Sequence, residues 1–327
     1  MTAMLTGHIP TTTAPEQTLH LQVAARESLT PEVVLLTLER ADGVPLPHWS
    51  PGAHVDLMLD IGPRQYSLCG DPTDPTRWQV AVLREPDGRG GSAYVHEQVH
   101  EGTEITVQGP RNHFALVEAP HYTFIAGGIG ITPLLPMIAQ ATRTGTPWRL
   151  FYGGRCLESM AFHDQLTSRY DEQVVLHPQD EHGVLDLPGI VESVPADGVV
   201  YCCGPEGLLG ALERTCSDRS MPTPHVERFA PKDLGDTEDV EFEVELAETG
   251  DIVNVPAGCS VLEALRQHGV DVPSSCQEGT CGTCETGVLA GTVEHRDSLL
   301  TPQEQEAMDT MFICVSRSRG ERLRLEL

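Results

Sequence analysis

Positive charge is scarce in this sequence. Among 327 residues there are 21 basic and 48 acidic ones, and the formal net charge is −27. Lys232 is the single lysine. The phosphate backbone of a nucleic acid must be met by lysine and arginine, and an anionic membrane surface also attracts basic segments. The composition therefore argues against nucleic acids and membranes as partners, and it favours a basic protein partner.

Long uninterrupted hydrophobic runs are missing too, and we expect no secretory leader. Residues 1–18 lack a basic start and an apolar stretch, and we expect them to form a flexible tail. Residues 122–141 carry no charge, but three glycines and two prolines interrupt them, which favours a strand, a turn and a helix over a membrane span. We therefore expect a cytoplasmic protein, in which a tight cysteine group binds metal or acts in catalysis more often than it forms disulfides.

The length predicts two or three domains. Residues 19–117 contain short β-branched or alternating segments separated by Pro, Gly and Asp, which predicts a small antiparallel β-barrel. Residues 118–229 alternate strands with helices, which predicts a parallel α/β domain. Residues 230–239 are polar and indicate a linker. Residues 240–327 form a last domain with a hairpin, a helix and two further strand-like segments, so the fold class is multidomain α+β.

Four of the ten cysteines have a spacing typical of a metal site. Three fall in CQEGTCGTC, residues 276–284, and the fourth follows after 29 intervening residues. This is the plant-type C-x4-C-x2-C…C spacing of a 2Fe–2S cluster, which assigns four ligands: Cys276, Cys281, Cys284 and Cys314. Gly279 and Gly282 would let the backbone approach the sulfurs closely. Zinc in an interaction module remains the alternative, although structural zinc usually takes its ligands in two close pairs.

Two glycine-containing turns follow expected strands of the α/β domain. AGGIGITP, residues 126–133, leads into a helix for which Thr132 is the expected N-cap, and free amides at such a turn suit a phosphate. A tight turn without a ligand is an equal alternative. YCCGPEG, residues 201–207, ends another strand, and open α/β sheets bind ligands beyond such ends. Cys203 is expected to face this crevice and Cys202 the core, while a small buried hydrophobe is the alternative for both.

The barrel region contains two further candidate phosphate sites. In RQYSL, residues 64–68, Arg64 and Tyr66 share one face of the expected strand, and an arginine beside a tyrosine suits a phosphate. GRGGS, residues 88–92, is a glycine turn that opens a helix, with Ser92 as the expected cap. Each could be an ordinary strand or turn, but together they predict a phosphorylated cofactor.

With these motifs in this order, residues 19–327 resemble the phthalate dioxygenase reductase family, within the ferredoxin–NADP reductase superfamily. The motifs that carry the resemblance are RQYSL, GRGGS, AGGIGITP, CCGP and CQEGTCGTC…C. The resemblance implies an FMN-binding antiparallel β-barrel, an NAD(P)-binding parallel α/β domain and a C-terminal plant-type ferredoxin domain of the β-grasp type.

The resemblance also implies roles for individual residues. Those implied for FMN are Arg64, Tyr66, Ser67, Leu68, Gly90, Gly91, Ser92 and Phe229. Those implied for the pyridine nucleotide are Gly127, Gly128, Gly130, Thr132, Cys203 and Gly204. Ser67, near the flavin N5, and Cys203, near the nicotinamide, are the implied catalytic residues. The four cysteines hold the 2Fe–2S cluster.

One position departs from the family pattern. Members often carry an acidic residue soon after the second α/β strand, where it favours NADH, and this chain has Arg155 in YGGRCLES. An arginine there could bind the 2′-phosphate of NADPH. The choice between NADH and NADPH stays open, and we favour NADH.

The resemblance implies a reductase that passes electrons from NAD(P)H through FMN and the cluster to a separate oxygenase. We expect an aromatic-ring dioxygenase or an O-demethylase, with a haem-thiolate monooxygenase as the alternative and a non-catalytic redox sensor as the alternative of another class. Residues 230–327 contain 20 acidic and 7 basic residues, which predicts docking of this part to a basic surface of the oxygenase. His113 is expected to be a packing residue rather than a ligand.

Overall fold

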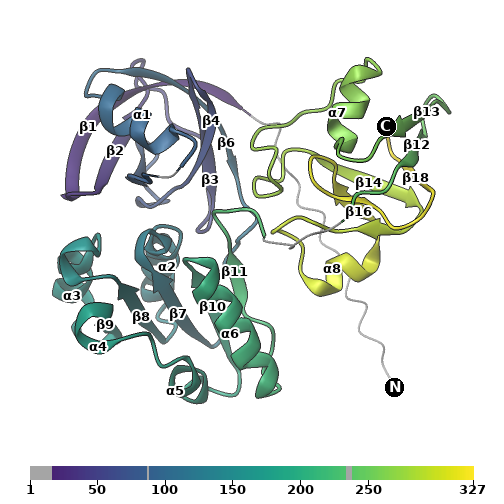
Figure 1. Cartoon of the computed structure of the whole chain (residues 1–327). Helices are drawn as coiled ribbons and strands as arrows, with labels where there is room; N and C mark the ends of the chain where they lie inside the picture. The colour runs from purple at the N-terminus through teal and green to yellow at the C-terminus, as the bar shows by residue number, and fades with distance from the viewer. Residues whose placement is uncertain (1–16, 87, 233–237) are drawn as a thin grey trace.

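The protein forms three main β-sheets, each with its own hydrophobic core. A computed structural model describes residues 17–86, 88–232 and 238–327. Most of the expected tail and the middle of the expected linker, residues 1–16 and 233–237, lie outside this range. Figure 1 shows the barrel at the upper left, the α/β domain below it, and the cysteine-bearing domain on the right.

The first sheet is the expected antiparallel barrel. Its strands are β1 (Thr18–Thr30), β2 (Val33–Glu39), β3 (His54–Leu59), β4 (Gly62–Ser67), β5 (Arg77–Leu83) and β6 (Glu104–Arg111). They pair in the order β4-β3-β6-β1-β2-β5, and a bridge between Leu68 and Val80 joins the two ends of this order. Helix α1 (Gly91–Gln98) packs onto the barrel core through Val95.

The second sheet is parallel and is covered by helices on both faces. Its strands are β7 (His121–Gly127), β8 (Trp148–Gly154), β9 (Val174–Pro178), β10 (Gly198–Cys203) and β11 (His225–Glu227). The helices are α2 (Leu134–Thr144), α3 (His163–Tyr170), α4 (Gln179–His182), α5 (Leu187–Glu192) and α6 (Glu206–Asp218). Helices α2 and α3 share a core with Cys203, whereas α5 and α6 share the opposite core with Cys202. The strand order β11-β10-β7-β8-β9 switches direction between β7 and β10, which is where such sheets bind ligands.

The third sheet has its last strand in the middle. The strands are β12 (Phe242–Leu246), β13 (Ile252–Val255), β14 (Glu285–Ala290), β16 (Thr310–Phe312) and β18 (Arg322–Leu325), in the order β13-β12-β18-β14-β16. Strand β18 pairs parallel with β12 and antiparallel with β14. A small ladder and two helices complete the domain: β15 (Val293–Glu294), β17 (Arg317–Ser318), α7 (Val261–Gln267) and α8 (Pro302–Ala307). Ser260 caps α7, whose apolar face packs into the core.

The barrel contacts its two neighbours in different ways. An apolar cluster joins it to the α/β domain, with Val33, Leu35 and Ala81 on one side and Ala161 and Phe162 on the other. The contacts to the cysteine-bearing domain that are described below are mainly polar. Apolar burial favours a permanent contact, whereas small polar interfaces permit relative motion.

Three expectations about local structure are wrong. Thr132 does not cap α2, because its backbone is already helical and its hydroxyl donates to the Ile129 carbonyl. Ser92 does not cap α1, which already begins at Gly91, and its hydroxyl accepts from the Glu85 N–H instead. One of the two strand-like segments expected after the cysteine stretch, residues 310–318, is broken between β16 and β17 by the turn that contains Cys314.

The apolar stretch 122–141 forms β7, a short 3-10 turn and α2, as predicted. Among the described residues, no helix is long and apolar enough to cross a membrane.

Candidate functional site

Four cysteine thiols meet in the third domain. Cys276, Cys281 and Cys284 lie on the loop before β14, and Cys314 lies on the turn after β16. The Cys276 thiol interacts with those of Cys281 and Cys314, and Cys314 also interacts with Cys284. The main-chain N–H of Glu278 donates to the Cys276 sulfur over 3.3 Å, and that of Cys276 donates to the Cys281 sulfur over 3.4 Å. The four cysteines of the sequence pattern are therefore neighbours in the structure, and main-chain N–H groups point at their sulfurs.

This donor set fits a 2Fe–2S cluster. A 2Fe–2S cluster spreads four thiolates over two irons, and hydrogen bonds to its sulfurs tune its potential. Gly279 and Gly282 have φ values of +70° and +79°, which let the loop curl around such a group.

The predicted phosphate residues of the barrel lie together. The Arg64 guanidinium donates to the Arg89 carbonyl over 3.0 Å, and it fills the space where a side chain at Gly91 would stand, with Nε only 2.4 Å from an ideal Cβ. Gly90 has a φ of +80° and precedes the first turn of α1. The turn thus places the main-chain N–H groups of the first helical turn beside the Arg64 guanidinium. Both kinds of donor suit a phosphate group.

The two glycine loops of the α/β domain also lie against each other. Strands β7 and β10 are adjacent, with Ala126 opposite Cys203. A Cβ on Gly130 would lie 2.2 Å from the Cys203 carbonyl oxygen, and one on Gly127 would lie 2.7 Å from Pro205. Both glycines are therefore needed for this close approach. Gly128, with a φ of +55°, has nothing within 4 Å of its ideal Cβ, which leaves room for a ligand over the turn.

Comparison with known proteins agrees with these sites. Residues 244–319 match the family model of the 2Fe-2S iron-sulfur cluster binding domain. The β subunit of a phenoxybenzoate dioxygenase from Ectopseudomonas oleovorans is 44% identical over 90% of this chain and 93% of its own. The structure of phthalate dioxygenase reductase has a TM-score of 0.68 at 35% identity and covers 95% of this chain and 98% of that one. The chain belongs to the phthalate dioxygenase reductase family.

A type IV self-sufficient cytochrome P450 monooxygenase is also similar, with a TM-score of 0.89 at 42% identity over 95% of this chain. The chain spans only 41% of that longer protein. This family member is thus an oxidoreductase that carries a 2Fe–2S cluster and binds FMN and a pyridine nucleotide. The expected family, fold class and cofactors are confirmed. The zinc alternative for the cysteines is wrong, because the matched domain holds a 2Fe–2S cluster.

A partly buried carboxyl links the two predicted catalytic residues of this reductase. In β11, Glu227 lies opposite Cys203, whose thiol donates to Glu227 Oε2 over 3.9 Å. The same carboxyl interacts with the hydroxyl of Ser67 from the barrel. Burial raises its pKa from 4.5 to about 8, although these two hydrogen bonds act in the opposite direction. Sequence reasoning missed Glu227, which stands two residues before Phe229 in VERFA.

The remaining predicted flavin residues lie in different surroundings. Tyr66 packs against the barrel core, and burial raises the pKa of its hydroxyl to about 12. Leu68 is completely buried in that core, and its N–H donates to the Ala53 carbonyl. Phe229 follows β11 and is 46% exposed. Of these three side chains, Phe229 has the largest face left for a cofactor.

Arg155 meets an acidic partner from the barrel. It follows β8, the second strand of the α/β domain, and its guanidinium forms an ion pair with Glu32 in the turn between β1 and β2. The Arg155 carbonyl accepts from the Asp180 N–H after β9. Glu32 is 123 residues away in sequence, so no local pattern could have predicted this pair.

The cysteine loop of the reductase contacts the barrel at several positions, one of which joins the buried His54 ring to the Cys281 main chain. The Ser275 hydroxyl donates to the Asp56 carboxylate over 2.5 Å, and Arg89 donates to Glu278 over 2.8 Å. A further contact is at Gly282, where an ideal Cβ would lie 2.1 Å from the ring of His113. His113 is thus a packing residue, as predicted, and burial lowers its pKa to about 4.

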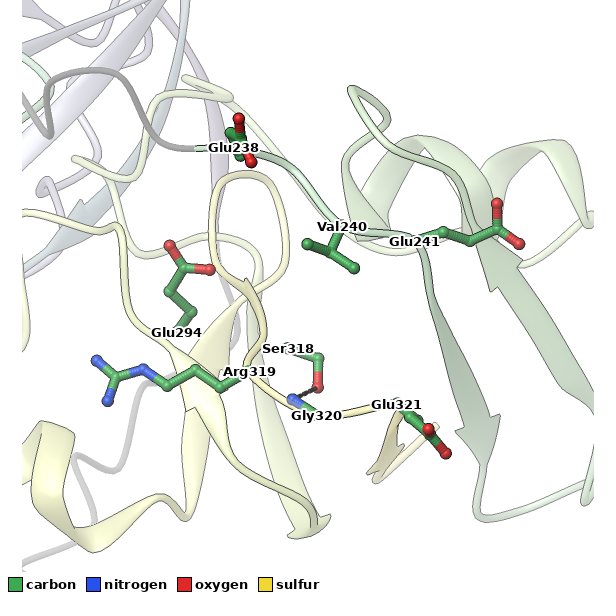
Figure 2. A pocket seen from close by; sticks show the side chains of 8 residues that line it. All are labelled: Glu238, Val240, Glu241, Glu294, Ser318, Arg319, Gly320 and Glu321. Carbon is green, nitrogen blue, oxygen red and sulfur yellow. Dashed lines mark hydrogen bonds between the residues drawn. The ribbon is translucent and has the colours of Figure 1, made fainter.

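An acidic groove of about 380 Å³ lies in the cluster-bearing domain. Figure 2 shows Glu294 and Arg319 on one side of it and Glu241 and Glu321 on the other. Glu238 also lines it. The groove contains none of the predicted cofactor residues.

Proposed function

We propose that this reductase takes a hydride from NADH at the site of Ser67, Glu227 and Cys203 and passes electrons to a separate oxygenase. When bound, the nicotinamide supplies two electrons as a hydride, FMN accepts the pair and releases electrons singly, and the 2Fe–2S cluster accepts one at a time. The observation that carries the proposal is the meeting of the three predicted sites. Glu227 joins the barrel to the α/β domain, and the cysteine loop contacts the barrel at Asp56, Arg89 and His113.

We assign the residues as follows. Arg64 and the Gly90–Ser92 turn bind the FMN phosphate, the Gly127–Gly130 turn binds the pyridine nucleotide diphosphate, and Phe229 covers the flavin. Ser67 and Cys203 orient the reacting rings. Because burial keeps a proton on Glu227 at neutral pH, its carboxyl can donate a hydrogen bond without placing negative charge beside an incoming hydride.

The test is anaerobic titration with NADH, followed by absorbance. We expect the flavin band to bleach and the cluster band to follow. Flavin bleaching with a cluster that stays oxidised would refute the order of electron flow. Absence of NADH-dependent cytochrome c reduction would favour the redox sensor instead.

We propose an aromatic-ring dioxygenase or an O-demethylase as the oxygenase, because the phenoxybenzoate dioxygenase subunit is 44% identical over nearly full length. A haem-thiolate monooxygenase is the second candidate, favoured by the 0.89 TM-score of the self-sufficient cytochrome P450. Supplying the purified reductase to one oxygenase of each class and measuring product per NADH distinguishes the two. The component that couples NADH oxidation to product formation identifies the class.

We propose that the oxygenase docks through a basic surface onto the acidic groove of Figure 2, and that both work in the cytoplasm. Opposite charge accelerates encounter and makes it dependent on salt. Replacing Glu241 and Glu321 by glutamine should slow oxygenase reduction. The control replaces two exposed carboxylates of the α/β domain, Glu172 and Glu192, in the same way. Equal rates in the two double variants would contradict docking at the groove.

A further inference from the structure

We infer that Asp56 of the barrel is a positioning residue that holds the cluster-binding loop in place for electron transfer from the flavin domain. The inference rests on the proposed order of electron flow. It concerns a contact between parts of the chain that are 219 residues apart.

Asp56 is a buried acceptor shared by two domains. It lies on β3 and is 1% exposed. Its Oδ2 accepts from Arg111 Nη2 over 2.6 Å and from the Ser275 hydroxyl over 2.5 Å. Arg111 comes from β6 of the same barrel, and its side chain is 8% exposed. The barrel thus presents a charged, pre-oriented oxygen to the residue that immediately precedes the ligand Cys276.

Further contacts complete the attachment of the loop. Arg89 binds Glu278, and the His113 ring lies against Gly282. The buried His54 ring of β3 also interacts with the main chain of Cys281. These contacts are spread along residues 275–282, so together they restrain the position and the orientation of the loop that carries the thiols.

The Asp56 contact is stronger than those of Arg89 and His113. Hydrogen bonds to an ionised acceptor are about twice as strong as neutral ones. The Arg89 and Glu278 side chains are 55% and 28% exposed, and such surface pairs contribute little. The His113 ring contributes packing against Gly282 rather than a hydrogen bond. Among the described residues, no apolar cluster joins the barrel to this loop. The Asp56–Ser275 hydrogen bond therefore contributes a large part of the stability of the interface.

The experiment uses the full-length protein with both cofactors and the variant Ser275→Ala. Stopped-flow mixing with NADH without oxygen follows the flavin and cluster bands separately. We expect flavin reduction at the wild-type rate and cluster reduction slowed by about tenfold, the effect of losing a hydrogen bond to a charged acceptor. Ser275→Thr keeps the hydroxyl and should restore the rate. Ser274→Ala is the matched control, because that hydroxyl contacts Arg266 in its own domain.

Hydrogen exchange supplies a readout that does not depend on turnover. In Ser275→Ala, the amides of β3 and of residues 112–114 should exchange faster, because the loop no longer covers them. Asp56→Asn should change exchange and cluster reduction in the same direction.

Three outcomes would overturn the inference. These are equal cluster reduction in Ser275→Ala and wild type, no rescue by Ser275→Thr, and loss of the cluster spectrum in Ser275→Ala, which would make Ser275 a support of the cluster itself. A wild-type cluster that stays oxidised while the flavin is reduced refutes the proposed function instead.

Discussion

The raised pKa of Glu227 predicts that the free energy of unfolding decreases as the pH rises. In the folded protein this carboxyl holds its proton up to about pH 8, whereas in the unfolded chain it ionises near 4.5. Between these values the folded state binds one proton more than the unfolded state, so stability falls as the pH rises. Below pH 4.5 and above pH 8 this group causes no further change.

The magnitude follows from the two pKa values. Within that window each pH unit removes about 1.4 kcal/mol of unfolding free energy. From pH 6 to pH 8 the loss from Glu227 is about 2 kcal/mol, since the carboxyl is half ionised at the upper limit. The variant Glu227→Gln keeps the shape and cannot ionise, so it should lack this loss.

The assay is urea unfolding of the flavin-loaded protein at several pH values. Flavin fluorescence is the signal, because flavin release reports on the barrel and the α/β domain that enclose Glu227, whereas global unfolding of three domains is not a two-state process. Glu206→Gln is the control, since it removes an exposed carboxylate that pairs with the neighbouring Arg228. It should keep the wild-type pH dependence. If wild type and Glu227→Gln lose the same stability between pH 6 and pH 8, Glu227 is already ionised and the reasoning is wrong.

Three further predictions concern the other sites. Cys281→Ala should remove the cluster spectrum and cytochrome c reduction, while NADH still bleaches the flavin. If cytochrome c reduction survives, the cluster is not the electron donor. Gly282→Ala should slow cluster reduction and destabilise its domain by at least about 1 kcal/mol, because of its positive φ and the His113 ring. Adding His113→Ala should recover part of the rate, and no recovery would mean that the backbone strain alone is responsible. Glu32→Gln should raise kcat/KM for NADPH several-fold relative to NADH by releasing Arg155, and an unchanged ratio would place the 2′-phosphate elsewhere.

Local patterns were enough to locate the turns and loops that carry the proposed cofactor residues. The spacing of the cysteines, the glycine turns and the strand alternation around Cys202 and Cys203 each depend on neighbours within a few residues. They led to the loops that the structure brings together. Cys202 and Cys203 lie on opposite faces of the sheet, as the two-residue period of a strand predicts. Both are completely buried in apolar cores, however, so the expectation that Cys203 faces an open crevice is wrong and the alternative of a small buried residue describes both.

The residues that sequence reasoning missed act through partners far along the chain. The role of Glu227 depends on the pairing of β11 with β10, which places it beside Cys203, and on the barrel, which places Ser67 beside it. Neither neighbour is close to Glu227 in the sequence. The sequence around Asp56 does not indicate its role, because its partner Ser275 lies 219 residues away. The two wrong helix caps have a local cause, because the N-cap of α1 is Gly90, two residues before Ser92, and the N-cap of α2 is Pro133, one residue after Thr132.

The central place of β18 bears on how the holoprotein is made. Among the described strands, β14 and β16 join the sheet of the β12–β13 hairpin through β18, whose residues leave the ribosome after all four ligand cysteines. Domains fold as units during synthesis, beginning with the N-terminal one. The barrel and the α/β domain can therefore fold while the sheet of the iron–sulfur domain still lacks its central strand. The sheet that supports the cysteine loop is thus completed only after all four ligands have been synthesised.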